Sequence, residues 1–227
     1  MRHRFYSVEP TISGVGVIDK AVLVLAAVQD RPRSLAELVE ATGLSRATAH
    51  RLASALETHG LLRRASDGRF ALGPRLLALG RAASSGWPLA EAAGAALAGL
   101  RDRTGESAQL YVRQGDQRVC VASLESPHGL RTIVGAGVAL PLDRGSGGRV
   151  LRGEVGADGW VASVGEREAG VASVSAPVSD DAGAVVAAIG VSGPIERLSR
   201  DPGERFGAAV VAAADRVAVD AGLRTVS

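Results

Sequence analysis

The stretch GLSRATAHRLASALETHGLLRR, residues 43–64, decides the fold of the first part of this chain. Ser45 is a favourable N-cap, and the residues after it predict a helix because apolar side chains recur at helical spacing. Thr48, Leu52 and Leu56 stand four residues apart, so we expect them to share the buried face. The polar residues of this helix come first and its apolar residues come last. Its N-terminal turn is therefore available to a polar partner.

Two further helices are expected before this stretch. Apolar spacing predicts one of them within residues 15–29. Ser34 and Glu37 have the spacing of a capping box, so the second helix is expected to begin directly after Ser34. Gly43 is a stop signal for that helix, because glycine adopts the left-handed conformation that often ends a helix.

A hairpin is expected after the third helix. Residues 61–73, LLRRASDGRFALG, predict two short strands joined by the two-residue turn Asp67–Gly68. Three helices followed by a hairpin, with a tight turn between the second and third helices, are the winged form of the helix-turn-helix. We therefore assign residues 1–73 to a winged helix-turn-helix DNA-binding domain.

The polar start of the third helix carries residue types that read double-stranded DNA. The first residues of a recognition helix meet base edges in the major groove. Arg46 can donate to guanine, and His50 can bond a base edge or a phosphate. Ser45 and Thr48 suit phosphate oxygens beside the helix N-terminus, and Arg51 is expected to face the DNA backbone.

A second face of this helix is expected to stay free, and it carries Arg46, Ala49, His50 and Ala53. In the hairpin, the arginines that can reach a flanking groove or phosphates are Arg63, Arg64 and Arg69. The candidate DNA-binding residues are Ser45, Arg46, Thr48, Ala49, His50, Arg51, Arg64 and Arg69. The alternative is a packing module of three helices with a solvated charged face.

The distribution of charge agrees with a polyanionic partner for the first domain. The whole chain has a net charge of +2, but residues 1–85 carry +5 and residues 86–227 carry −3. A basic segment of this kind is typical of nucleic-acid binding, although chance clustering also produces it. No apolar run reaches membrane-spanning length, and the N-terminus MRHRFYSVEP has no secretory pattern. We therefore expect a cytoplasmic protein without a membrane partner.

Residues 74–85 predict a linker helix between two domains. Its leucines, Leu76, Leu77 and Leu79, form an apolar side that has no obvious partner in the first domain. A contact between two copies of the chain and a plain spacer between domains both explain this side.

Residues 86–227 predict a second domain of the α+β class. A helix comes first, several antiparallel strands with hairpins at Gly115–Asp116 and at 180–183 follow, and an amphipathic helix ends the chain. The Gly/Ser-rich stretch GSGGRVLRG is expected to enter a short helix. Such a loop can close its backbone N–H groups on a small polar or anionic ligand, although a flexible connection is the alternative.

No enzyme site is expected in this chain. Cys120 lies between valines in a predicted strand, which is typical of a buried structural thiol. One cysteine excludes an internal disulfide and a multi-cysteine metal site. The four histidines are scattered without metal-ligand spacing, and the Gly-rich loop lacks the ending of a P-loop. We therefore expect no catalytic residue, no metal and no cofactor.

The chain resembles the IclR-type bacterial transcription regulators over nearly its whole length. The stretches that carry the resemblance are GLSRATAHRLASALETHGLL, GRFALGPRLLALG, RTGESAQLYV, LPLDRGSGGRVL, SVGEREAGVASVSAPV and VVAAIGVSGPIERL. Several of them are also similar to the actinobacterial branch of NdgR-like regulators of amino-acid metabolism. The resemblance implies a winged helix-turn-helix, a linker helix and a C-terminal GAF-like α/β effector-binding domain. It also implies a homodimer or tetramer.

The resemblance further implies a small-molecule effector, for which an amino acid or a keto acid is expected. By resemblance, the effector-binding residues are Thr132, Ser146, Gly147, Ser163, Glu166, Ser173 and Ser192. The chain departs from the family pattern after GGRVLRG, where only EVGAD stands in place of a further helix and a linker. The alternative functions are a DNA-binding scaffold without an effector and a small-molecule enzyme on the C-terminal domain.

Overall fold

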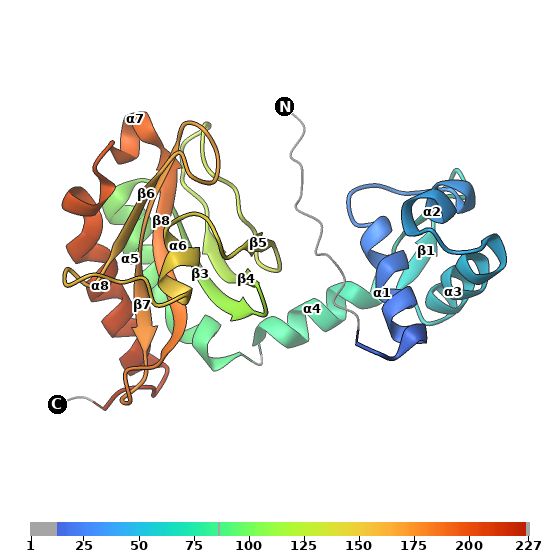
Figure 1. Ribbon diagram of the computed structural model, residues 1–227, viewed down its shortest axis with the longest axis horizontal. Coiled ribbons are helices and arrows are strands. Elements are labelled where there is room, and N and C mark those ends of the chain that lie inside the picture. Colours follow the sequence, from blue (N-terminus) through green and yellow to red (C-terminus); the bar gives the residue numbers. More distant parts are fainter. Residues whose placement is uncertain (1–12, 86, 226–227) are drawn as a thin grey trace. The chain divides into compact units, whose positions relative to one another are not determined.

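The computed structural model describes residues 13–85 and 87–225. The chain divides into two compact units, Met1–Gly86 and Trp87–Ser227. Figure 1 labels the helices and strands of both units. Within the described residues, no helix is both long and apolar enough to cross a membrane.

The first unit begins with three helices, α1 (Gly16–Ala27), α2 (Leu35–Thr42) and α3 (Arg46–Thr58). The predicted capping box of α2 is confirmed, because the Ser34 side chain accepts from the Glu37 backbone N–H and the Glu37 carboxylate accepts from the Ser34 backbone N–H. Gly43 ends α2 in the left-handed conformation, with a φ of 66°. The turn between α2 and α3 is therefore as tight as the sequence predicts.

The wing consists of β1 (Leu62–Arg64) and β2 (Phe70–Leu72), which pair antiparallel. Its turn differs from the predicted two-residue turn. Gly68 N donates to Ala65 O, and Ala65 N donates to Arg69 O, so the turn is longer and Gly68 ends it with a φ of 79°. A hairpin of this length uses glycine at the left-handed position after the turn, and this is the role of Gly68. Helix α4 (Arg75–Ser85) follows the wing.

The core of the first unit lies between α1, α2, α3 and the wing. It is built from the buried apolar residues Val24, Val28, Leu38, Ala53, Leu56, Leu62 and Phe70. The predicted buried face of α3 is confirmed at Leu56, which belongs to the core, but the face is centred nearer to Ala49 and Ala53 than predicted. Ala49 and Ala53 are fully buried, whereas Thr48 and Leu52 are only partly buried. Alanine has a short side chain, so these two positions let α3 approach its neighbours closely and leave Leu52 at the edge of the contact.

The second unit is a six-stranded antiparallel sheet with helices on both faces. The strands lie in the order β5-β4-β3-β8-β7-β6. Their bounds are β3 (Ser107–Gln114), β4 (Gln117–Leu124), β5 (Ala139–Pro141), β6 (Val161–Val164), β7 (Val171–Ser179) and β8 (Val185–Pro194). The helices are α5 (Pro88–Thr104), α6 (Ser146–Leu151), α7 (Ile195–Leu198) and α8 (Pro202–Asp220).

Alternation along the strands separates an apolar face of this sheet from one that mixes polar and apolar residues. The long helices α5 and α8 cover the apolar face, where Leu110, Val174 and Ile189 join the larger core cluster. The short helix α6 packs on the other face, as Figure 1 shows. The strand residues that alternate with the core residues therefore face α6. Because many of these residues are polar, a polar pocket forms on this side.

The connection between α6 and β6, residues 152–160, contains turns and no helix in this described segment. This agrees with the short EVGAD segment that the sequence has at this place. A second, smaller apolar cluster between α6 and the sheet includes Tyr111, Cys120, Leu142 and Val150. It supports one side of the polar pocket.

Candidate nucleic-acid interface and ligand pocket

The start of α3 is organised by two hydroxyl groups. The Ser45 side chain accepts from the Thr48 backbone N–H at 3.3 Å, so Ser45 is the N-cap, as predicted. The Ser45 hydroxyl also donates to Thr48 Oγ1 at 2.9 Å. A Ser N-cap of this kind satisfies one of the unpaired N–H groups at the start of a helix. Both hydroxyls lie at the end of the helix that is suited to phosphate oxygens.

Three cationic or ionisable side chains project from the first two turns of α3. Arg46, His50 and Arg51 are exposed. Within residues 13–85 and 87–225, none of the three has a side-chain hydrogen bond or ion pair. Ala49 is a correction to the predicted set, because it is 0% exposed and packs inside the unit. This side chain cannot touch DNA in the observed fold.

The wing arginines differ in how strongly the protein itself binds them. Arg69 lies 3.3 Å from the Glu37 carboxylate and 3.2 Å from that of Asp67. Arg64 stacks over the Phe70 ring at 3.6 Å and donates to Gly68 O at 2.8 Å. Arg63 is exposed and has no such partner in the described part of the chain. Arg63 is therefore the wing arginine with the most freedom to meet a phosphate.

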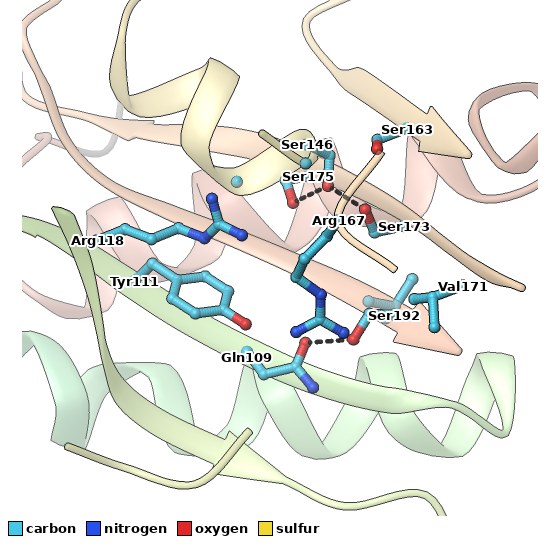
Figure 2. Close-up of a pocket in the computed structure, with 13 residues that line it drawn as sticks. Gln109, Tyr111, Arg118, Ser146, Ser163, Arg167, Val171, Ser173, Ser175 and Ser192 are labelled. Atoms are coloured by element: carbon cyan, nitrogen blue, oxygen red, sulfur yellow. Dashed lines mark hydrogen bonds between the residues drawn. The ribbon is translucent and has the colours of Figure 1, made fainter. Parts of the chain in front are cut away.

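The polar pocket of the second unit lies between α6, the sheet and the loop from β6 to β7. Figure 2 shows its lining. The lining residues are Gln109, Tyr111, Arg118, Gly145, Ser146, Gly147, Ser163, Arg167, Val171, Ser173, Ser175, Val191 and Ser192. The free volume is about 30 Å³, which is room for one or two water molecules. In this state the side chains themselves fill most of the site.

Serine hydroxyls form one wall of the pocket. Ser146 Oγ donates to Ser173 Oγ at 2.8 Å and lies at the same distance from Ser175 Oγ. Ser192 donates to Gln109 Oε1 at 3.1 Å. The dashed lines in Figure 2 mark these bonds. Hydroxyls can turn to donate or accept, so this wall can adapt to a polar ligand.

Two arginines reach into the pocket. Arg118 is 3% exposed, and its Nη1 donates to Pro141 O and to Arg144 O, each at 2.6 Å. Its Nε has no hydrogen-bond partner, and neither does Gln109 Nε2. Burial lowers the pKa of Arg118, and the nearby Arg167 adds to this effect, but an arginine stays charged in a protein. The pocket therefore carries positive charge and unused donors.

Five of the seven predicted effector residues meet in this pocket: Ser146, Gly147, Ser163, Ser173 and Ser192. Thr132 and Glu166 do not line it. The backbone oxygen of Thr132 accepts from Ser107 Oγ at 2.6 Å, so Thr132 belongs to a loop pinned on β3. Glu166 accepts from Gly145 N at 3.0 Å and faces Arg149, so it holds the loop between β6 and β7 against the start of α6.

The sequence reasoning missed Gln109, Tyr111, Arg118, Arg167 and Ser175. A signal for Gln109 and Tyr111 exists in SAQLYV, where they alternate with Ala108 and Leu110 of the core. The same alternation in VASVSAPV places Ser175 on the side of Ser173. Arg118 and Arg167 have no comparable signal, because their roles depend on which loops lie across the sheet.

The one cysteine of the chain, Cys120, is buried and shows no sign of a reactive thiol. Burial raises the pKa of the Cys120 thiol to about 12, and the thiol donates to Ala122 O at 3.3 Å. Such a thiol is a weak nucleophile at neutral pH. Among the described residues, no group of three His, Cys, Asp or Glu side chains could hold a metal ion.

Comparisons with known proteins agree with this architecture. The IclR helix-turn-helix domain matches residues 17–66, and the C-terminal domain of the bacterial transcriptional regulator IclR matches residues 152–219. The chain is 30% identical over 215 residues to the glycerol operon regulatory protein of Streptomyces griseus, covering 80% of this chain and 85% of that protein. The chain belongs to the IclR family of bacterial transcriptional regulators. Its first unit therefore contains the DNA-binding helix-turn-helix of an IclR regulator, and its second unit is the effector-binding domain.

Solved structures of IclR proteins show the same fold. The IclR transcriptional regulator of Alicyclobacillus acidocaldarius superposes with a TM-score of 0.76 at 22% identity, covering 92% of this chain and 99% of that one. An IclR homologue from Microbacterium hydrocarbonoxydans, solved in complex with 4-hydroxybenzoate, has the same TM-score and identity, covering 91% and 99%.

Proposed function

We propose that this IclR regulator binds operator DNA through the start of α3 and is controlled by a small carboxylate in the serine–arginine pocket. The effector is an amino acid or a keto acid, and the regulated genes serve amino-acid metabolism, as the resemblance to NdgR-like regulators implies. The protein acts in the cytoplasm, where both the chromosome and such metabolites are found.

The observation that carries the DNA-binding part is the unpaired positive end of α3. Arg46, His50 and Arg51 are exposed and lack partners in the described residues. Unpaired guanidinium groups at the start of a recognition helix are available to guanine and to phosphates. Ser45 and Thr48 add hydroxyl donors at the same end. In the wing, Arg63 is our candidate for a phosphate contact, while Arg64 and Arg69 first have to leave their protein partners.

The pocket supports a carboxylate effector rather than a scaffold without ligand. Arg118 and Gln109 keep buried donors that no protein group satisfies. An unsatisfied buried donor is costly, so a bound acceptor at this place stabilises the domain. The pocket lining also lacks a base beside a nucleophile, which an enzyme would need for covalent chemistry. The 4-hydroxybenzoate of the Microbacterium homologue is itself a carboxylate.

The functional unit is a homodimer or a tetramer. Leu77 and Leu79 on α4 are 74% and 50% exposed in the single chain. Exposed leucines of this kind are favourable at a contact between two copies of the chain. A dimer presents two recognition helices to half-sites one helical turn apart, and a ligand-induced change in their spacing alters DNA affinity.

A gel-shift experiment with the DNA upstream of the protein's own gene tests this proposal. We expect retardation at moderate salt, and a change of at least several-fold in DNA affinity when an effective keto acid or amino acid is present. Absence of retardation contradicts the DNA-binding part. Retardation that no candidate metabolite changes contradicts the effector part.

A further inference from the structure

We infer that the pocket of the second unit takes a dicarboxylate, with one carboxylate on Arg118 and the other on Arg167. This inference rests on the proposed function, because it assigns a ligand class to the proposed effector site. It is narrower than that function. A regulator that binds a monocarboxylate or an amino acid would agree with the proposed function and contradict this inference.

The charge of the pocket is unbalanced. Its thirteen lining residues include two arginines and no aspartate or glutamate. Figure 2 shows both guanidinium groups inside the pocket, with Arg118 beside the Tyr111 ring and Arg167 directed toward Gln109 and Ser192. Two cations at short range in a partly dry site repel one another. One carboxylate would neutralise one of them, and two carboxylates neutralise both.

Arg118 is the fixed end of the site. Its Nη1 donates to the carbonyl oxygens of Pro141 and Arg144. The centroid of the Tyr111 ring lies 5.4 Å from its Cζ. Neither carbonyl carries a full negative charge, and no carboxylate of the described residues forms an ion pair with Arg118, although Asp143 is near enough to raise its pKa. Its Nε is buried and has no partner. A carboxylate that accepts from this guanidinium supplies both a direct ion pair and the missing acceptor.

Arg167 is the movable end of the site. Its side chain is 15% exposed, and the nearest carboxylate, that of Glu168, is 4.0 Å away. Arg167 lies on the loop between β6 and β7, where Gly165 and Gly170 have positive φ values of 72° and 84°. The observed free volume of about 30 Å³ is too small for a dicarboxylate, so a side chain must move. Arg167 is the cation that can withdraw toward solvent and then close on the second carboxylate.

The same arrangement disfavours an amino acid. The α-ammonium group of an amino acid would enter a pocket that holds two guanidinium groups and no acidic side chain. Like charges in such a site repel, and a buried ammonium without a carboxylate partner is costly. The inference therefore favours acids without an amino group among the effectors proposed above.

Calorimetric titration of the purified full chain tests the inference. The ligands are succinate, butyrate and inorganic phosphate, because butyrate has the same carbon chain with one carboxylate and phosphate is a compact anion. We expect succinate to bind about ten- to a hundred-fold tighter than butyrate or phosphate, as an added charged hydrogen-bonded pair implies. In the Arg167→Gln variant we expect the affinity for succinate to fall to that of butyrate.

Two further variants show whether a loss of succinate affinity comes from the lost charge of Arg167 or from a general disturbance of the fold. Arg167→Lys keeps a cation and is expected to retain a preference for succinate. Arg216→Gln removes an exposed arginine of α8, outside the pocket lining, and is expected to bind succinate as the parent does. Circular dichroism confirms that each variant is folded.

Four outcomes overturn the inference. They are equal affinity for succinate and butyrate, phosphate binding as tight as succinate binding, unchanged succinate affinity in Arg167→Gln, and no binding of any of the three ligands. Tight butyrate binding would leave the proposed carboxylate sensor intact. The gel-shift experiment without ligand tests the DNA-binding function independently of all four outcomes.

Discussion

Arg197 forms a bidentate ion pair with the carboxylate of Glu106 through two hydrogen bonds. Its Nε donates to Oε1 at 2.6 Å, and its Nη2 donates to Oε2 at 2.9 Å. Glu106 is 1% exposed, and Arg197 also donates to the backbone oxygen of Leu130 at 2.7 Å. The pair therefore joins the start of β3, the helix α7 and the loop that follows β4.

We expect the Arg197→Met variant to lose about 3 kcal/mol in the free energy of unfolding, because it leaves the Glu106 carboxylate buried without a partner. Urea unfolding of both proteins measures the loss. The double variant Arg197→Met, Glu106→Gln should be more stable than Arg197→Met alone, since it contains no buried charge. A double variant as unstable as the sum of the two single variants would contradict this coupling.

The start of α3 gives a prediction on DNA affinity. We expect Arg46→Ala to weaken binding to the operator by about 1–3 kcal/mol if the guanidinium contacts a base. Fluorescence anisotropy with a labelled upstream fragment measures this change. His59→Ala is the matched control, because His59 is also exposed but caps the opposite end of α3. Equal losses in the two variants would argue against a reading role for the first turn.

The wing gives a separate prediction on salt dependence. Arg63 has no protein partner in the described residues, whereas Arg69 is paired with Glu37 and Asp67. A phosphate contact contributes about one unit to the slope of log affinity against log salt. We expect Arg63→Ala to reduce this slope by about one and Arg69→Ala to reduce it less. Titrations at several salt concentrations measure both, and the reverse order would assign the phosphate contact to Arg69.

The capping box of α2 gives a prediction on pH. The backbone N–H of Ser34 and then the guanidinium of Arg31 lower the pKa of Glu37 from 4.5 to about 2. The stability that the ionised carboxylate contributes is complete above pH 4.5 and is lost as the pH falls toward about 2. We expect Glu37→Gln to melt below the parent at pH 7, with a difference that shrinks across this window. A difference that does not vary with pH would contradict the lowered pKa.

Much of the first unit could be predicted from sequence because its signals are local. The capping box at Ser34, the glycine stop at Gly43 and the N-cap at Ser45 each depend on residues within one turn. The buried face of α3 could be predicted less well than these helix ends. Spacing alone fits Leu52 as well as Ala53, and only the approach of α1 and α2 decides between them.

The pocket serines of β6, β7 and β8 were expected from the resemblance to the family. Alternation along these strands explains in physical terms why their side chains share one face of the sheet. Arg118 belongs to a strand as well, but its role depends on Pro141 and Arg144, which lie more than twenty residues away. Contacts of that range arise from the course of loops, for which a single sequence gives no periodic signal.

Gly148 in α6 lies where only glycine fits beside the pocket. A Cβ at Gly148 would collide with the backbone oxygen of Leu142 and with Nη1 of Arg118. The backbone oxygen cannot turn away, so we expect Gly148→Ala to displace Arg118 and to cost about 1–3 kcal/mol in the free energy of unfolding. Succinate titration should show weakened binding, because the fixed cation of the pocket has moved.

Gly94→Ala is the control for this change. Gly94 also lies in a helix, α5, and a Cβ there would meet no atom within 4 Å. Alanine favours helix more than glycine does, so this variant should be as stable as the parent or slightly more stable. Thermal unfolding and succinate binding of both variants give the comparison. If Gly148→Ala matched Gly94→Ala in both measurements, the proposed position of Arg118 beside α6 would be wrong.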